Sequence, residues 1–153
     1  MYTREQASLM RQKFWTQFGK YMAPVASASG EKINWINYKT GIPHLFFRMN
    51  AGKESAYIGI EMPQNISEHA PKFYQQFLLL KPMLQDQMKE TWIWEEAFEN
   101  ETYQPLSRIY TQLKPANIFN EADWPAIISF LKPRIIALDY FWYHHKMIFE
   151  MIG

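Results

Sequence analysis

The chain has 153 residues, enough for one domain with a hydrophobic core that needs no disulfide or metal to hold it together. Its 16 basic and 15 acidic side chains nearly cancel, so no overall field draws the protein to nucleic acid or to an anionic membrane. The lack of cysteine excludes disulfides, thiol nucleophiles and cysteine-ligated zinc or iron–sulfur sites.

Aromatic residues make up 17% of the chain, and in a domain of this size we expect some of their rings to reach the surface. Such a surface favours association with a protein partner or with a second copy of the chain. No signal-peptide pattern and no apolar run of membrane-spanning length occurs in the sequence. We therefore expect a single domain over residues 1–153, located in the cytoplasm and without a membrane partner.

Residues 3–22 are expected to form the first helix. Thr3 and Gln6 have the spacing of a capping box, and the apolar side chains from Met10 to Met22 recur at helical intervals. The small residues of the segment 23–30 then indicate a loop.

Residues 33–63 are typical of an antiparallel meander. β-Branched and aromatic residues are dense in 33–39, 44–49 and 56–62, and the turn residues 40–43 and 50–53 separate these runs. Connections this short join antiparallel neighbours. Bulky side chains occur on both parities of the first run, which leaves open which face of the sheet is buried.

The second half of the chain predicts two more helices and a hairpin. A helix is expected over residues 67–89, with Ser67 as its N-cap and with Pro82 as a kink or a break. Strands follow at 91–98 and 106–113, joined by a turn at residues 99–102. The last helix begins after Asn120 as N-cap and continues almost to the C-terminus, with a kink expected at Pro133.

These elements predict an α+β fold in the order αβββαββα. About five mainly antiparallel strands would pack against three long helices, which cover one or both faces of the sheet.

Strand alternation places a group of polar side chains on one face of the second and third expected strands. His44 and Arg48 share a face of one strand, and Tyr57, Gly59 and Glu61 share a face of the next. If these faces coincide, Arg48 and Glu61 are cross-strand partners. The group is then either a binding site, with Gly59 leaving room for a ligand, or a solvated face with a surface ion pair.

Aromatic and basic residues also interleave along the expected strands, a mixture that can stack bases and neutralise phosphates. The alternative is that the rings belong to the core. The residues concerned are Trp35, Tyr38, Trp92, Trp94, Lys32, Lys39, Arg48 and Lys53.

The sequence predicts no cofactor and no metal site. His144 and His145 are adjacent, so on a helix they point about 100° apart and cannot chelate one ion. Asp139 lies within an apolar run and is either a buried carboxylate paired with Arg134 or Arg108, or a residue on the wet side of its helix.

Several segments together resemble a bacterial domain-of-unknown-function family. They are GEKINWINYKTG (30–41), LFFRM, YIGIEM, WIWEEA, SRIY and IFNEADWPAIISFLKPRIIALDYFW (118–142). Members of that family look like free-standing small proteins or C-terminal appendages of nuclease-type domains. The resemblance implies a role near nucleic acid or in phage defence, by context alone.

The expected element order is also similar to the core of restriction-endonuclease-like proteins. That chemistry needs an acidic residue on the second strand and an acidic residue followed by lysine on the third. Here the second strand ends Phe-Arg-Met-Asn without a carboxylate, and Pro63 occupies the lysine position after Glu61. An active nuclease of that kind is therefore not expected.

The sequence thus favours a non-enzymatic binding or accessory module with no catalytic residues. Its candidate binding residues are His44, Arg48, Tyr57, Glu61, Trp35 and Lys39. The alternative is an unorthodox nuclease-related enzyme in which Glu61 and a second acid, Glu31, Glu54 or Glu95, hold a divalent metal.

Overall fold

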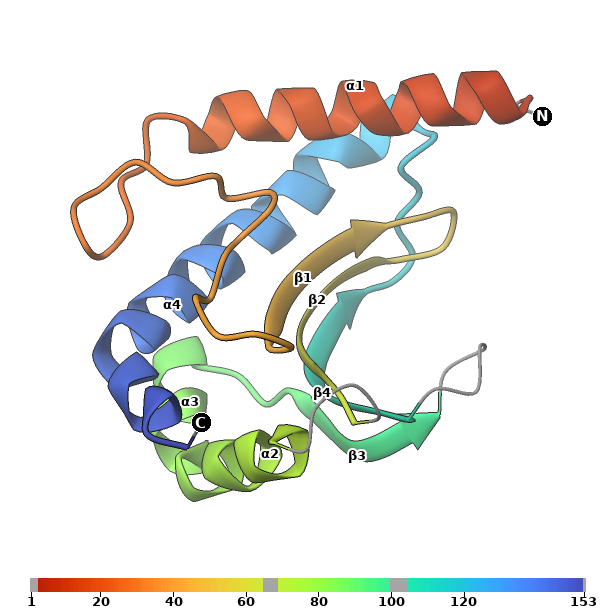
Figure 1. The fold of residues 1–153 in the computed structure, drawn as a ribbon. Coiled ribbons are helices and arrows are strands. Elements are labelled where there is room, and N and C mark those ends of the chain that lie inside the picture. The colour runs from red at the N-terminus through yellow and green to blue at the C-terminus, as the bar shows by residue number, and fades with distance from the viewer. Residues whose placement is uncertain (1–2, 65–68, 100–104, 153) are drawn as a thin grey trace.

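The structure is a computed structural model that describes residues 3–64, 69–99 and 105–152. Its fold is α+β, with an antiparallel sheet of four strands and helices packed beside it (Figure 1). In chain order the elements are α1 (Arg4–Met22), β1 (Phe46–Ala51), β2 (Ala56–Pro63), α2 (Ala70–Leu79), α3 (Lys81–Met88), β3 (Ile93–Glu99), β4 (Pro105–Leu113), the 3-10 turn η1 (Glu121–Asp123) and α4 (Trp124–Glu150).

The sheet has the strand order β1-β2-β4-β3, and every neighbouring pair is antiparallel. The two central strands, β2 and β4, are not consecutive in the chain. Gly59 of β2 lies between Arg48 of β1 and Tyr110 of β4, and Tyr110 in turn lies opposite Ile93 of β3. These registers fix which side chains share a face of the sheet.

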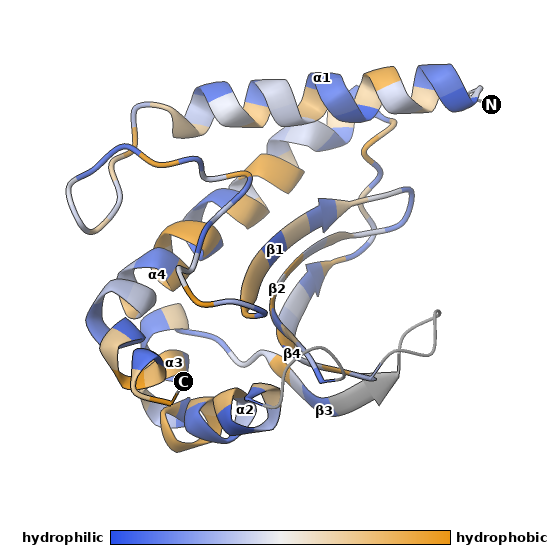
Figure 2. Cartoon of the chain, viewed as in Figure 1, coloured by the Kyte–Doolittle hydropathy of each residue, from blue (hydrophilic) through white to orange (hydrophobic). Residues whose placement is uncertain are grey.

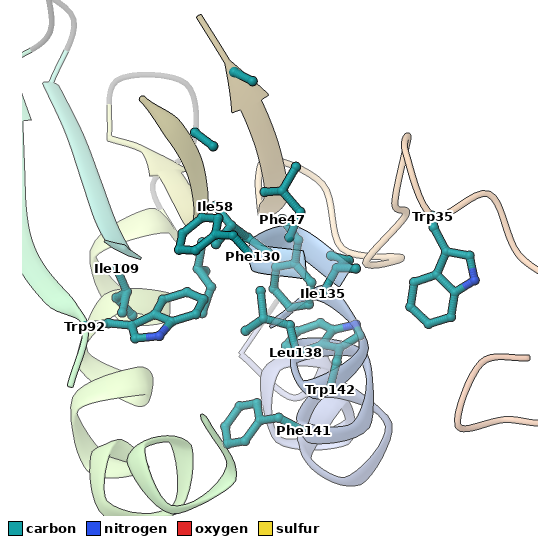
Figure 3. Packing of buried hydrophobic residues seen from close by; sticks show 14 of the residues in the cluster. Trp35, Phe47, Ile58, Trp92, Ile109, Phe130, Ile135, Leu138, Phe141 and Trp142 are labelled. Carbon is teal, nitrogen blue, oxygen red and sulfur yellow. The ribbon is translucent and has the colours of Figure 1, made fainter. Parts of the chain in front are cut away.

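One face of the sheet is buried under helices. Ile58, Ile60 and Ile109 are fully buried on this face. Figure 3 shows Phe47, Ile58 and Ile109 of the strands packed toward side chains of α4, including Leu138. Apolar segments of α4 are turned toward the sheet in Figure 2, as expected for an amphipathic layer.

Helix α1 lies across the first turns of α4 (Figure 1). Its capping box is formed as predicted, with Thr3 and Gln6 each accepting from the backbone N–H of the other. Phe14 meets Trp124 edge to face at a centroid distance of 5.5 Å. The helix is thus held by ring packing against the start of α4.

The helix expected over residues 67–89 is split into α2 and α3, which confirms the break anticipated at the proline. Pro82 lies in the first turn of α3, where its missing N–H does not weaken the helix. His69 precedes α2, whereas the expected cap Ser67 lies outside the described residues. The described chain therefore has four α-helices instead of three. Pro133, by contrast, lies inside α4 without ending it.

The prediction of a first strand over residues 33–39 is wrong. Residues 33–39 form bends and turns, so the described sheet has four strands and not five. Trp35 explains why: its ring is 3% exposed and its indole N–H donates to the Val25 carbonyl at 3.0 Å, which anchors a loop. Of the turn expected at residues 99–102, Glu99 ends β3 and the rest lies outside the described residues.

None of the helices in the described ranges has a segment long and apolar enough to cross a bilayer.

Candidate functional site

The uncovered face of the sheet carries a group of charged and aromatic side chains that we call the open-face network. The strand registers place its residues on the opposite side of the strands from the buried Phe47, Ile58 and Ile109. The members of the network are Arg48 of β1, Tyr57 and Glu61 of β2, Arg108 and Tyr110 of β4, and Glu95 of β3.

Glu61 is the centre of one half of the network. Arg48 Nε lies 3.0 Å from Oε1 of Glu61, and the Tyr57 hydroxyl donates to Oε2 at 2.7 Å. The predicted cross-strand pair of Arg48 and Glu61 is therefore confirmed. Glu61 is largely covered at 16% side-chain exposure, whereas Arg48 is 52% exposed and also lies over the Phe46 ring.

Arg108 is the centre of the other half. Its Nε donates to Oε1 of Glu95 at 2.8 Å, and its guanidinium lies 4.0 Å from the centroid of the Tyr110 ring. The side chains of Arg108 and Glu95 are mostly covered, so this ion pair is less screened by water than an exposed one. The hydrogen bond and the ring contact together fix the guanidinium plane.

Gly59 allows the two halves to meet. The rings of Tyr57 and Tyr110 stack at a centroid distance of 5.4 Å. A Cβ on Gly59 would lie 2.5 Å from the Tyr57 hydroxyl oxygen and 2.9 Å from Cβ of Tyr110. The absence of a side chain at this central position therefore lets the Tyr57 ring lie along the sheet and reach Glu61.

The electrostatics of the network keep it neutral overall. Burial, followed by the nearby Glu61 carboxylate, raises the pKa of Tyr57 well above its ordinary value, so its phenol stays protonated. For Arg108, burial opposes the charge, but the hydrogen bond to Glu95 raises the pKa overall. Two guanidinium groups thus face two carboxylates, which gives no excess positive charge for a phosphate backbone.

A pocket of about 620 Å³ extends from this network over the edge of β1. It is bordered on one side by the loop residues 36–38 and on the other by Arg48, Tyr57 and Glu61, and it reaches Leu106 at the start of β4. Since β1 is an outer strand of the sheet, the pocket gives access to both a backbone edge and the open face.

Three of the candidate residues come together and three do not. Arg48, Tyr57 and Glu61 join the network. His44 precedes β1 with a φ of 64°, so strand alternation does not apply to it. Trp35 is buried in the loop, and Lys39 lines a separate pocket of about 460 Å³ between that loop and α4.

The tryptophans expected to stack bases belong largely to the core. Trp35 and Trp92 are buried, at 3% and 4% exposure. Trp94 lies on the helix side of the sheet, with its ring edge to face against Tyr74 at 6.0 Å. For these three rings the structure therefore agrees with the alternative left open by the sequence, in which they belong to the core.

Sequence reasoning named Glu95 only as a possible metal ligand and Arg108 only as a possible partner of Asp139, and it missed Tyr110. Arg108 and Tyr110 occupy alternate positions in β4, the same period-two pattern that revealed Arg48 and Glu61. That signal alone did not show that β4 lies beside β2, because their pairing spans α2, α3 and β3.

Asp139 is buried, but its predicted partners are wrong. Its carboxylate accepts hydrogen bonds from the Tyr38 hydroxyl at 2.6 Å, the Ser27 hydroxyl at 2.9 Å and the backbone N–H of Ala28 at 2.8 Å. Arg134 instead pairs with Glu90 at 2.8 Å. Asp139 therefore fastens the loop after α1 to α4.

The described residues contain no group of three or more His, Asp or Glu side chains that could hold a metal ion. The element order also differs from the one that suggested a restriction-endonuclease-like core, because only two strands precede α2.

Comparison with known proteins identifies one family. No curated protein and no solved structure matches the chain. A family model described as a domain of unknown function (DUF4268) matches residues 10–146, which is most of the 153-residue chain. The matched range includes β1 to β4, residues 10–22 of α1 and residues 124–146 of α4. The chain therefore belongs to the DUF4268 family of domains of unknown function.

Proposed function

We propose that this chain is a protein-binding module that holds an extended segment of its partner along β1 and over the open-face network. The observation that carries the proposal is the pocket of about 620 Å³, which joins the outer strand β1 to a set of fixed polar and aromatic side chains. Binding by strand addition uses such an edge for backbone hydrogen bonds and the neighbouring face for side-chain selection.

The edge of β1 is regular. All six of its residues pair in one continuous register with β2, from Phe46 opposite Glu61 to Ala51 opposite Ala56. The other outer strand, β3, is interrupted by a register shift between Glu95 and Phe98, a feature that discourages pairing with a further strand. Of the two edges, β1 is therefore the better template for an added strand.

The chemistry of the network fits a protein better than a nucleic acid. Arginine and tyrosine are the residues most often found at the energetic centre of protein interfaces. Since Glu61 and Glu95 balance the charge of the two arginines, the network lacks the excess positive charge that favours a run of phosphates. Arg48, half exposed at the pocket, is placed to receive an acidic side chain of the partner.

The alternative of a nuclease-related enzyme has less support. A metal-dependent nuclease needs at least two converging carboxylates that are available to the ion. The carboxylates of Glu61 and Glu95 are each engaged by an arginine. The association with nucleases and phage defence implied by the family resemblance concerns the setting of such a module and not its chemistry.

The test is to pan a library of random displayed peptides against the purified protein. We expect enriched peptides that alternate apolar and polar residues and carry an acidic side chain. The variant Arg48→Glu should weaken their binding by about tenfold or more, the effect of about 1.4 kcal/mol. Lys20→Glu makes the same charge change on the exposed surface of α1 and should leave affinity unchanged.

Backbone pairing is tested separately by N-methylating the synthetic peptide at alternate residues. Methylation of one set of residues should abolish binding and methylation of the other set should be tolerated, because only one set of N–H groups faces β1. Failure to enrich any peptide would contradict the proposal. So would peptides whose affinity is unchanged both by Arg48→Glu in the protein and by either methylation pattern.

A further inference from the structure

A second surface, unlike the neutral open-face network, carries excess positive charge. The first turns of α1, the turn between β1 and β2, and the segment after β4 lie at one end of the molecule (Figure 1). Residues of all three line a pocket of about 390 Å³. It contains three basic side chains and no acidic one. The lining residues are Thr3, Arg4, Ala7, Arg11, Lys53, Asn117 and Phe119.

Helix α1 directs two of the cations to the same place. Arg4, Ala7 and Arg11 are spaced by three and four residues, so they lie on one face of the helix. The small side chain of Ala7 leaves room between the two guanidinium groups. Arg11 is further fixed by its position 5.0 Å from the centroid of the Phe119 ring.

The turn that carries the third cation is held by backbone hydrogen bonds. Lys53 lies in the turn between β1 and β2, which is tied to the segment after β4 at two points. The N–H of Ala116 donates to the Glu54 carbonyl at 3.0 Å, and the N–H of Ile118 donates to the Gly52 carbonyl at 2.9 Å. Lys53 and Asn117 are therefore carried by one joined unit of backbone.

Asn117 adds a donor of fixed direction. Its side-chain oxygen accepts the N–H of Phe119 at 2.9 Å. The amide nitrogen, which has two N–H donors, therefore remains available at the pocket. The site combines guanidinium, ammonium and amide donors, the set that recognises an anionic oxygen group.

The charges of this pocket are not neutralised within the described chain. Arg4, Arg11 and Lys53 form no ion pair with a described residue, whereas the nearby Lys13 pairs with Glu121 at 2.7 Å. Three exposed cations that line one pocket without a described counter-ion favour a multiply charged anion over a single carboxylate.

We propose that this pocket binds a phosphate group, carried either by a nucleotide or by a single-stranded nucleic acid. Arg4, Arg11 and Lys53 contact the phosphate oxygens, and the Asn117 amide orients them. The site is separate from the open-face network, so it adds a ligand to the proposed function and does not depend on it.

The experiment measures binding by the full chain to three probes, which are inorganic pyrophosphate, ATP and a fluorescent thymidine homopolymer. We expect the homopolymer affinity to fall with added salt with a log–log slope of about −2, as for three phosphate contacts on a single strand. Saturable binding of ATP or pyrophosphate without length dependence in the homopolymer would identify a nucleotide as the source. Affinity that grows with homopolymer length would identify a nucleic-acid strand.

Variants at the pocket make the test specific. The double variant Arg4→Gln with Lys53→Gln should reduce the affinity for the bound probe at least tenfold and, for the homopolymer, bring the salt slope to about −0.7. The matched control, Lys20→Gln with Lys32→Gln, removes two exposed cations elsewhere and should change neither quantity. Arg11→Lys keeps a positive charge in the pocket and tests whether phosphate binding needs the planar guanidinium group.

Two outcomes would overturn the proposal. One is absence of binding to all three probes at low salt, and the other is an equal loss in the control variant. Because Arg48→Glu should leave phosphate binding intact and the pocket variant should leave peptide binding intact, failure here is distinguishable from failure of the proposed function.

Discussion

The Tyr57 hydroxyl donates to Glu61 at 2.7 Å along the same strand, and the ring reaches that position across Gly59. A methyl group at residue 59 would meet both the Tyr57 hydroxyl and the Cβ of Tyr110 at less than ordinary contact distance. The second contact is the costly one, because Cβ of Tyr110 is fixed by its backbone.

We therefore expect Gly59→Ala to destabilise the protein by about 1–3 kcal/mol, the usual cost of forcing an extra methylene into a packed position. Chemical denaturation of the purified variant measures this. Gly52→Ala is the matched control, since a Cβ there meets nothing within 4 Å, and it should be nearly neutral. Equal stability of the two variants would contradict the close approach of the Tyr110 Cβ to residue 59.

The ion pairs of the open face and of α1 should differ in strength. The side chains of Arg108 and Glu95 are 19% and 28% exposed, whereas those of Lys13 and Glu121 are 63% and 55% exposed. A double-mutant cycle to alanine on Lys13 and Glu121 should give a coupling of about 0.5 kcal/mol or less. The same cycle on Arg108 and Glu95 should give a larger value, of about 1–2 kcal/mol, because the charge-assisted bond is shielded from water.

High pH should destabilise the protein through its buried phenols. The pKa of Tyr57 is raised above its ordinary value of 10.0 by burial and then by Glu61, and the pKa of Tyr38 is raised by burial and then by its hydrogen bond to Asp139. In the unfolded chain these phenols ionise near pH 10. The unfolded state then binds fewer protons than the folded state, so the free energy of unfolding falls as the pH rises above about 10.

In Tyr57→Phe the free energy of unfolding should decrease less steeply with pH above about 10, by up to about 1.4 kcal/mol per pH unit. Urea unfolding at a series of pH values measures the slope, and Tyr143→Phe, which removes an exposed hydroxyl on α4, is the control. A slope that is unchanged in Tyr57→Phe would contradict the burial of this phenol.

Asp139→Asn should loosen the loop that follows α1. The carboxylate accepts from Tyr38, Ser27 and Ala28, and an amide in its place presents an N–H₂ group to at least one of these donors. Each donor left unsatisfied costs about 1–3 kcal/mol. We expect faster hydrogen exchange in residues 23–45 together with lower global stability, and protection in this loop equal to that of the unchanged protein would refute the role of Asp139.

The parts of the fold that sequence reasoning predicted depend on local chemistry. The capping box at Thr3, the break at Pro82 and the pairing of Arg48 with Glu61 involve residues close together in the chain or joined by one short turn. Helical spacing and strand alternation are sufficient for these features.

The parts that were wrong depend on distant contacts. Residues 33–39 have the composition of a strand, but Trp35 donates to Val25 and Tyr38 donates to Asp139, so the segment is bound to a loop and a helix. Arg108 was missed as a neighbour of the site because β4 inserts beside β2 across two helices and a strand. Local propensity predicts neither the contacts of residues 33–39 nor the pairing of β4 with β2.

The insertion of β4 between β2 and β3 sets the order in which the domain is completed during synthesis. The hairpin of β1 and β2 emerges early, but the second hydrogen-bonding edge of β2, from Ala56 to Pro63, is satisfied only when residues 105–113 follow. A nascent chain therefore displays an apolar, half-paired ribbon while α2, α3 and β3 are still being made. In that interval the ribbon is open to pairing with other nascent chains, and the arrival of β4 ends this exposure.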